Sequence, residues 1–187
     1  MTQKFSSAKP GEHHDQDHPI ETMWEGKFIT AKRRGKWEYV SRSRGIKAAV
    51  ILAVQDGHVL LVEQFRVPLG KSAIELPAGL IGDDGEEEDP LSAAGRELEE
   101  ETGYRAGRLE NLGEFYSSPG MVSESFTLVK ADELIKISDG GGVEGEDITV
   151  HHIALDNLTD FLDEKRRGGC AIDVRLLMLP GVVAFSD

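Results

Sequence analysis

Cysteine is almost absent from this chain, since Cys170 is the single one among 187 residues. One cysteine cannot form a disulfide within the chain, which excludes the disulfide framework of small secreted domains. The N-terminal stretch up to residue 19 also lacks the apolar core of a secretory signal. We therefore expect a cytoplasmic protein.

Long apolar runs are missing as well. The longest lies near residues 46–54, far short of the roughly 20 residues that cross a bilayer, so we expect no transmembrane helix and no membrane partner. Positive charge is also scarce, because 21 Lys and Arg residues face 34 Asp and Glu residues and the formal net charge is -13. A field of that sign repels phosphate, which argues against a nucleic-acid partner.

Hydrophobic residues make up 39% of the chain, which is enough to bury a core, and the length favours a single domain. We expect residues 1–19 to form a disordered polar tail and residues 20–187 to form that domain. Within it, residues 20–45 are expected to supply N-terminal strands and residues 46–187 a catalytic core.

Strand and helix patterns are mixed along the chain. Runs rich in β-branched and aromatic residues predict strands at 36–42, 46–54, 58–65, 72–77, 109–118, 125–131 and 147–155. Helices are predicted at 90–102, 156–168 and 171–185. The first of these helices is marked at both ends, by Asp89 and Pro90 before it and by Gly103 after it. This order favours an α/β fold in which a mixed β-sheet is sandwiched between helices.

Acidic residues are concentrated in one stretch. Residues 83–101 contain ten of them and one basic residue, Arg96. On a helix, Glu97, Glu100 and Glu101 share one face because they are three and four positions apart. Such crowding raises the electrostatic cost of folding, which Arg96 offsets in part and a hard divalent cation such as Mg²⁺ would offset further. A solvated acidic helix face is the alternative interpretation.

The spacing around this helix favours the first interpretation. Residues 82–104 read GDDGEEEDPLSAAGRELEEETGY, which fits the pattern G-x5-E-x7-R-E-U-x-E-E-x-G-U, where U is apolar. The fixed positions are Gly82, Glu88, Arg96, Glu97, Leu98, Glu100, Glu101 and Gly103. Eight residues at fixed spacing are a specific signal, and in them the chain resembles the Nudix hydrolases, whose signature this is.

Two positions depart from that signature. Tyr104 stands where the family usually has an aliphatic residue. Gly79, in the segment PAGLI, is a better structural match to the first glycine than Gly82, so the loop from Gly79 to Glu88 is longer than usual. The sequence leaves the path of this loop open.

Beyond the signature, the chain resembles the branch of ADP-ribose pyrophosphatases and ADP-sugar pyrophosphatases. The segments that carry this resemblance are WEGKFITAKRRGKWEYVSRSR, VEQFRVPLG, IELPAGLI, FYSSPGMVSE and EGEDITV. It implies a homodimer in which the N-terminal antiparallel strands cross to the partner subunit. It also implies hydrolysis of ADP-ribose to AMP and ribose 5-phosphate with Mg²⁺, and the sequence leaves open whether Mn²⁺ replaces Mg²⁺.

The same resemblance implies residues that bind the nucleobase. Phe28 and Trp37 match two aromatic residues that sandwich adenine across the dimer interface in similar enzymes, and stacking on aromatic rings stabilises bound bases. Glu38 is placed to accept a hydrogen bond from the adenine amino group. The alternative for all three is a strand with one buried face.

Arg42 and Arg66 match arginines that contact the diphosphate or the terminal ribose. The planar guanidinium group suits phosphate oxygens, and an acidic protein needs local cations to admit an anionic ligand. Pairing with acidic surface residues is the alternative. Glu75 is expected to add a polar contact.

For the metal ions, the resemblance implies four ligands: the carbonyl oxygen of Ala78 and the side chains of Glu97, Glu100 and Glu101. Glu88 and Arg96 are expected to form a structural pair that holds the loop against the helix. The general base must come from elsewhere, and the segment VEGEDITV offers Glu144 and Glu146. We favour Glu144 as the base and Glu146 as a further metal ligand, with Glu124 as a third candidate for the base.

Three functions stay open. The first is hydrolysis of the diphosphate of ADP-ribose or a similar nucleoside diphosphate sugar, and the second is the same chemistry on GDP-mannose or a dinucleotide. The third is a non-catalytic sensor of nucleotide sugars. A sensor would be expected to lose signature carboxylates and to gain a basic appendage for DNA, whereas every carboxylate is present and no such appendage is visible.

Overall fold

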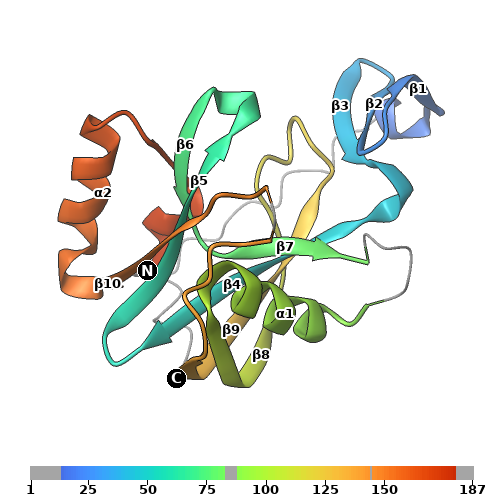
Figure 1. Cartoon of the computed structure of the whole chain (residues 1–187). Helices are drawn as coiled ribbons and strands as arrows, with labels where there is room; N and C mark the ends of the chain where they lie inside the picture. The colour runs from blue at the N-terminus through green and yellow to red at the C-terminus, as the bar shows by residue number, and fades with distance from the viewer. Residues whose placement is uncertain (1–13, 83–87, 144, 180–187) are drawn as a thin grey trace, which may run out of the picture. The chain divides into compact units, whose positions relative to one another are not determined.

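The computed structural model describes residues 14–82, 88–143 and 145–179 (Figure 1). It divides into two compact units, the first made of Met1–Gly45 and Tyr116–Glu124 and the second of Ile46–Phe115 and Ser125–Asp187. The expected single domain over residues 20–187, with N-terminal strands at 20–45 and a catalytic core at 46–187, stays a prediction. The assignment of Tyr116–Glu124 to the first unit had no signal in the sequence.

The first unit is a three-stranded antiparallel sheet in the order β1-β2-β3. Its strands are β1 (Ile20–Glu25), β2 (Ile29–Arg34) and β3 (Trp37–Arg42). Of the predicted tail, residues 1–13 lie outside the described residues, whereas His14–Asp17 form a short 3-10 helix. The backbone of Val40 in β3 holds the second segment of this unit by hydrogen bonds to Met121 and Ser123.

The second unit contains a mixed sheet, as the sequence predicted. Its strands are β4 (Lys47–Gln55), β5 (His58–Arg66), β6 (Lys71–Glu75), β7 (Ala78–Ile81), β8 (Tyr104–Tyr116), β9 (Ser125–Lys136), β10 (Thr149–Ala154) and β11 (Ala171–Ile172). The order is β11-β6-β5-β4-β9-β8, with β10 beside β5 and β7 beside β4. Strands β4 and β9 are parallel, as are β6 and β11, while β5 is antiparallel to β4, β6 and β10.

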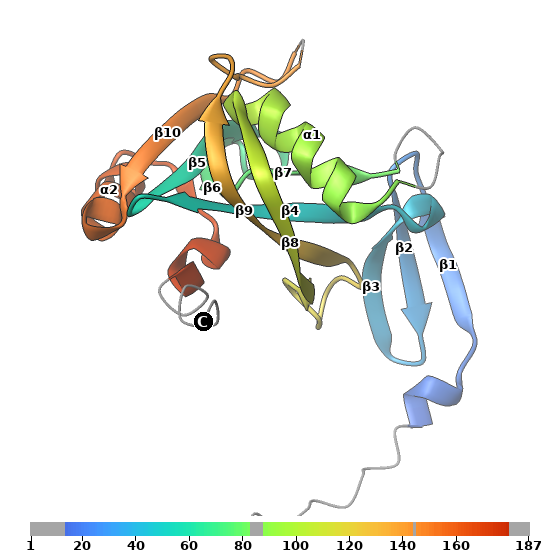
Figure 2. The same ribbon diagram turned by 90° about the horizontal axis from the view of Figure 1, so that it is seen from below.

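Strand β4 sends alternate side chains into two separate groups of buried residues. Ile51 packs with Leu60 and with Leu98 of α1 (Pro90–Thr102). The next residue, Leu52, packs in the other group, which includes residues of α2 (Leu158–Arg167). Figure 2 shows the two helices at different parts of the sheet. This arrangement confirms the predicted sandwich of a sheet between helices.

Helix α1 begins and ends where its sequence predicts. The Asp89 side chain accepts hydrogen bonds from the backbone N–H groups of Leu91 and Ser92, at 3.1 and 3.2 Å, and Pro90 is the first helical residue. Gly103 has a left-handed backbone with a φ of 75° and donates its N–H to the carbonyl of Glu99. Because both ends are fixed by local chemistry, the register of the acidic face is fixed with them.

Two expectations about secondary structure were wrong. The helix predicted over residues 171–185 does not start at residue 171, because Ala171–Ile172 pair with the edge of β6 and Val174–Met178 then form a 3-10 helix capped by Asp173. Residues 180–185 lie outside the described residues. The expected loop from residue 79 also contains strand β7, which pairs with β4. In the part of the chain that the structure describes, no helix is long and apolar enough to cross a membrane.

Candidate active site

Two carboxylates of helix α1 lie against strand β7, since Glu101 contacts Ala78 and Glu97 lies against Gly79. The side chain of Glu97 is 15% exposed and that of Glu100 is 36% exposed, while Glu101 is buried. Leu98 and Ala94 on the neighbouring face lie in the core. The helix therefore holds three carboxylates at the border between core and solvent.

Arg96 connects this acidic face to the preceding loop. Its guanidinium group donates to Glu97 Oε1 at 2.9 Å and to Glu100 Oε2 at 3.3 Å. It also donates to both carboxylate oxygens of Glu88, at 3.4 and 3.3 Å. The structure thus brings the expected pair of Glu88 and Arg96 together. The hydrogen bond with Glu88, above all, raises the pKa of Arg96.

Glu101 is 5% exposed and accepts a hydrogen bond from the backbone N–H of Ala78 at 3.0 Å. Burial, above all, and the charges of Glu97 and Glu146 raise the pKa of Glu101 to about 8, against the effect of the Ala78 N–H. Burial also raises the pKa of Glu97, although Arg96 opposes it. These two carboxylates are in an environment that disfavours their negative charge.

Gly79 lies against Glu97. A Cβ atom at Gly79 would be 1.9 Å from Glu97 Cδ, a separation that no pair of carbon atoms that are not bonded can adopt. Gly82 instead has a φ of 71° and donates its N–H to Glu88 at 3.4 Å. Gly79 thus has the close-packing role of the first signature glycine, and Gly82 has a role in the turn. Asp83 to Glu87, the middle of the lengthened loop, lie outside the described residues.

The charge of Glu146 is one of the causes that raise the pKa values of Glu97 and Glu101. Glu146 therefore lies near this acidic face. Its Oε2 accepts a hydrogen bond from the Val143 N–H at 3.0 Å. Gln64 Nε2 of β5 donates to the Glu146 carbonyl at 3.3 Å, a contact that no pattern in the sequence indicates. Glu144, the favoured candidate for the base, lies outside the described residues.

Arg66 and Glu75 form a two-point ion pair in the second unit. Arg66 Nε and Nη2 donate to Glu75 Oε1 and Oε2 at 2.7 and 2.9 Å. This hydrogen bonding raises the pKa of Arg66. Arg175, which the sequence analysis missed, lies 3.6 Å from Glu75 and also pairs with Asp173. The predicted phosphate-binding arginine is therefore held in place by the buried carboxylate of Glu75.

In the first unit, Arg42 Nε donates to Glu124 Oε1 at 2.6 Å. This contact joins an expected ligand of the diphosphate to a candidate for the base. Phe28 and Trp37 are 54% and 52% exposed. In the β2–β3 pairing, Ile29 faces Arg42 and Trp37 faces Arg34. Phe28 directly precedes Ile29, so the two aromatic residues lie near opposite ends of the hairpin, about 20 Å apart at about 3.3 Å per residue. Phe28 and Trp37 of one chain therefore do not face each other across one base.

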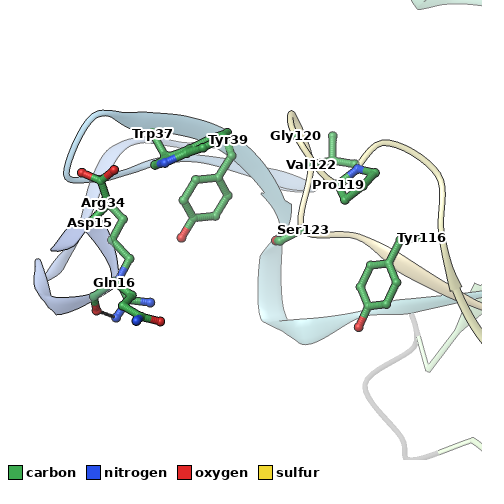
Figure 3. A pocket seen from close by; sticks show the side chains of 10 residues that line it. All are labelled: Asp15, Gln16, Arg34, Trp37, Tyr39, Tyr116, Pro119, Gly120, Val122 and Ser123. Atoms are coloured by element: carbon green, nitrogen blue, oxygen red, sulfur yellow. Dashed lines mark hydrogen bonds between the residues drawn. The ribbon is translucent and has the colours of Figure 1, made fainter. Parts of the chain in front are cut away.

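Trp37 lines a hollow of about 690 Å³ in the first unit (Figure 3). Tyr39, on the same face of β3, and Tyr116, Pro119 and Val122 also line it. Figure 3 shows the Tyr39 ring between Trp37 and Ser123, with Tyr116 on the far side. Glu38 is not among its lining residues, because neighbouring residues of a strand point to opposite faces.

The described residues do not include three His, Cys, Asp or Glu side chains that already converge on one point as metal ligands. The contacts above account for this, since Arg96 engages Glu97 and Glu100 while Ala78 engages Glu101. The donor set is nevertheless one of oxygen atoms, which Mg²⁺ prefers. These oxygen donors would fit a hard divalent cation if the three carboxylates exchanged their hydrogen bonds with Arg96 and Ala78 for bonds to the metal.

Comparison with known proteins gives a consistent result. A model of the NUDIX domain matches residues 43–165. The chain is 40% identical over 119 residues to a methanol dehydrogenase activator of Bacillus methanolicus and 38% identical over 120 residues to an ADP-ribose pyrophosphatase of Bacillus subtilis (strain 168). Each match covers 63% of this chain and 63% of the relative, so the alignments span somewhat less than two thirds of these proteins.

Longer matches exist. A GDP-mannose pyrophosphatase of Cronobacter sakazakii is 36% identical over 167 residues, which cover 84% of this chain and 80% of the relative. A crystal structure described as that of an ADP compounds hydrolase superposes with a TM-score of 0.62 and 26% identity, covering 78% of this chain and 80% of that one. The signature on α1 and the fold around it therefore agree with the comparisons, and the chain belongs to the NUDIX domain family.

Proposed function

We propose that the protein is a Mg²⁺-dependent hydrolase that cleaves the diphosphate bond of a nucleoside diphosphate sugar. ADP-ribose is the first candidate substrate, with AMP and ribose 5-phosphate as products. The observation that carries the proposal is the acidic face of α1, where the pKa values of Glu97 and Glu101 are both raised beside a third carboxylate, Glu100. A cation that binds there would relieve the cost of this crowding.

The carboxylates of Glu97, Glu100 and Glu101 and the carbonyl of Ala78 would hold the divalent cation, which is Mg²⁺ in the first instance or Mn²⁺. When bound, it polarises the diphosphate and lowers the pKa of the attacking water. Arg96 fixes the directions of the Glu97 and Glu100 side chains.

Proton removal from the water is proposed for the segment VEGEDITV, with Glu144 as the base and Glu146 as a further metal ligand. The position of Glu146 near Glu97 and Glu101 supports an acidic group from this segment in the site. Glu124 is a weaker candidate because its carboxylate is engaged by Arg42.

The substrate side of the proposal has support from the aromatic hollow. Trp37 and Tyr39 offer ring faces on which a nucleobase can stack, a contact that contributes about 1–3 kcal/mol per base. Relatives include an ADP-ribose pyrophosphatase and GDP-mannose pyrophosphatases. GDP-mannose is therefore the second candidate substrate, favoured by the longer alignment with a relative of that name.

We also propose that the protein is a homodimer through its N-terminal strands. Every residue of β1 is exposed, including Ile20, Met23 and Trp24. A second copy would cover these apolar side chains and would let Phe28 of one subunit approach the base that stacks on Trp37 of the other. Sedimentation of the purified protein at micromolar concentration measures the mass, and a monomer would contradict this part. The expected cytoplasmic location and the expected lack of nucleic-acid and membrane partners stay predictions.

A substrate panel tests the function. Purified protein is incubated with ADP-ribose, GDP-mannose, another ADP-sugar and a dinucleotide, each with Mg²⁺ and with Mn²⁺, and kcat/KM is compared. We expect release of a nucleoside monophosphate, with the largest kcat/KM for ADP-ribose. If no substrate is cleaved at any concentration of either metal, the proposed hydrolase is wrong and a nucleotide-sugar sensor becomes the better interpretation.

A further inference from the structure

The connection from β9 to β10 is bonded directly to the C-terminal end of α1. Gly141 N–H donates to the carbonyl of Glu101 at 2.9 Å, and Gly142 N–H donates to the carbonyl of Glu100 at 3.0 Å. Figure 2 shows this connection beside the end of α1 from which β8 departs. The last carbonyls of a helix lack partners within the helix, and here the loop backbone supplies them.

Glycine is required on both sides of this contact. A Cβ atom at Gly140 would be 2.4 Å from the carbonyl carbon of Thr102, and one at Gly103 would be 2.3 Å from the carbonyl oxygen of Ser138. Both glycines also have a positive φ, of 67° and 75°. The last glycine of the Nudix signature thus packs backbone to backbone against the loop. The role of these two glycines is therefore to allow close approach of the two backbones.

The same loop fixes Glu146. Ile148 N–H donates to the Gly141 carbonyl at 3.1 Å and closes the loop at its base. Within the loop, Glu146 Oε2 accepts from Val143 N–H at 3.0 Å, and a Cβ atom at Gly142 would be 2.4 Å from that oxygen. Gln64 Nε2 holds the Glu146 carbonyl from the side of β5, at 3.3 Å. The carboxylate of Glu146 is therefore located by the glycine segment on one side and by Gln64 on the other.

We propose that Gly140, Gly141 and Gly142 form a joint that positions the Glu146 carboxylate relative to those of Glu97 and Glu101. This inference rests on the proposed function, because diphosphate hydrolysis needs these acidic groups at a fixed separation. The joint acts through the backbone of Glu100 and Glu101, the same residues whose side chains are proposed to hold the cation. Gln64 is a second positioning residue, which acts through the loop and not on the substrate.

Gly142→Ala tests the joint without removing any carboxylate. The three atoms nearest to the added methyl group all belong to side chains, two of Glu146 and one of Ile148, so we expect the fold to survive while Glu146 is displaced. A displacement of about 1 Å at a reacting group can cost about 100-fold in rate, and we expect kcat to fall at least tenfold while KM changes little. Gly57→Ala is the matched control, since Gly57 has a φ of 71° in a hairpin turn with no atom within 4 Å of an added Cβ. This control should keep the wild-type kcat.

A double variant separates positioning from general damage. If the glycine acts through Glu146, Gly142→Ala should have no further effect on kcat in a Glu146→Gln background. Multiplicative losses in the double variant would overturn the proposal, and so would a wild-type kcat in Gly142→Ala. Gln64→Leu should show the same dependence on Glu146, with a smaller loss of kcat.

Hydrogen exchange tests the joint without any activity. In the metal-free protein, the amides of Gly141 and Gly142 should be protected to the same degree as those of the last turn of α1, and Gly140→Ala should remove this protection. Unprotected amides in the wild type would overturn the joint, whatever the protein hydrolyses. Protected amides in a protein that cleaves no nucleoside diphosphate sugar would support the joint and contradict the proposed function.

Discussion

Replacement of Glu101 by Gln should make the metal-free protein more stable at alkaline pH, although it should remove most of the activity. Glu101 is 5% exposed, and its pKa is raised to about 8 from an ordinary value of 4.5. A carboxyl group with a higher pKa in the folded state favours folding fully below its unfolded pKa, and this contribution is lost as the pH rises through the folded pKa. At about 1.4 kcal/mol per pKa unit, the wild type should lose up to roughly 5 kcal/mol between pH 4.5 and pH 8 from this group.

Urea unfolding in the presence of a chelator, at pH 5 and at pH 9, measures the effect. The free energy of unfolding should fall between pH 5 and pH 9 in the wild type because Glu101 becomes charged. Gln does not titrate, so the fall in Glu101→Gln should be smaller than that in the wild type by at least about 2 kcal/mol. Glu99→Gln on the same helix is the control. Glu99 pairs with Arg105 at 2.6 Å, and this hydrogen bond lowers the pKa of Glu99. The control variant should not share the gain at alkaline pH.

Two results would refute the reasoning. One is an identical pH dependence for the wild type and Glu101→Gln, which would mean that the buried carboxylate carries no electrostatic cost. The other concerns the increase in the free energy of unfolding when Mg²⁺ is added at pH 9. The cation is proposed to bind the negative charge of Glu101, which the variant lacks, so an equal increase in the variant and the wild type would contradict the proposed site.

Three further predictions concern the site. Gly79→Ala should raise the Mg²⁺ concentration needed for half-maximal activity at least tenfold, because its Cβ occupies the place of Glu97, and an unchanged metal titration would contradict this. Trp37→Ala should raise the KM for the nucleotide substrate about 5- to 150-fold, the equivalent of about 1–3 kcal/mol of stacking, with little change in kcat; a lower kcat at unchanged KM would argue against a role in base binding. Glu144→Gln should lower kcat without changing the Mg²⁺ concentration needed for half-maximal activity, whereas Glu146→Gln should change that concentration. Steady-state kinetics at several Mg²⁺ concentrations measure both effects, and the reverse result would exchange the two roles.

The sequence predicted the features that local chemistry determines. The bounds of α1 follow from Asp89, Pro90 and Gly103, which act on their own neighbours, and the shared face of its carboxylates follows from helical spacing. The strands predicted at 46–54 and 58–65 correspond to β4 and β5, which are joined by a turn at Asp56 and Gly57. By contrast, β7 has four residues, too few to show an alternating pattern, and its place is set by pairing with β4.

Contacts between distant parts of the chain could not be predicted in the same way. Glu101 and Ala78 are 23 positions apart, and Gln64 and Glu146 are 82 positions apart, so no spacing rule connects them. The sequence offered Gly82 by spacing and favoured Gly79 by its surrounding segment, but the physical reason for that choice needed the structure. What distinguishes them is the side chain that packs against each one.

The alternation of β4 between two buried groups has a consequence for how this fold tolerates change. Ile51 contributes to the group behind the acidic helix and Leu52 to the group behind α2. A shift of pairing by one residue turns every side chain of a strand to the opposite face, so one inserted residue in β4 would disrupt both groups at once. A substitution, in contrast, reaches a single group. Single substitutions can therefore adjust the packing beneath α1 while the group beneath α2 stays intact, whereas a change in the length of β4 would disturb both groups together.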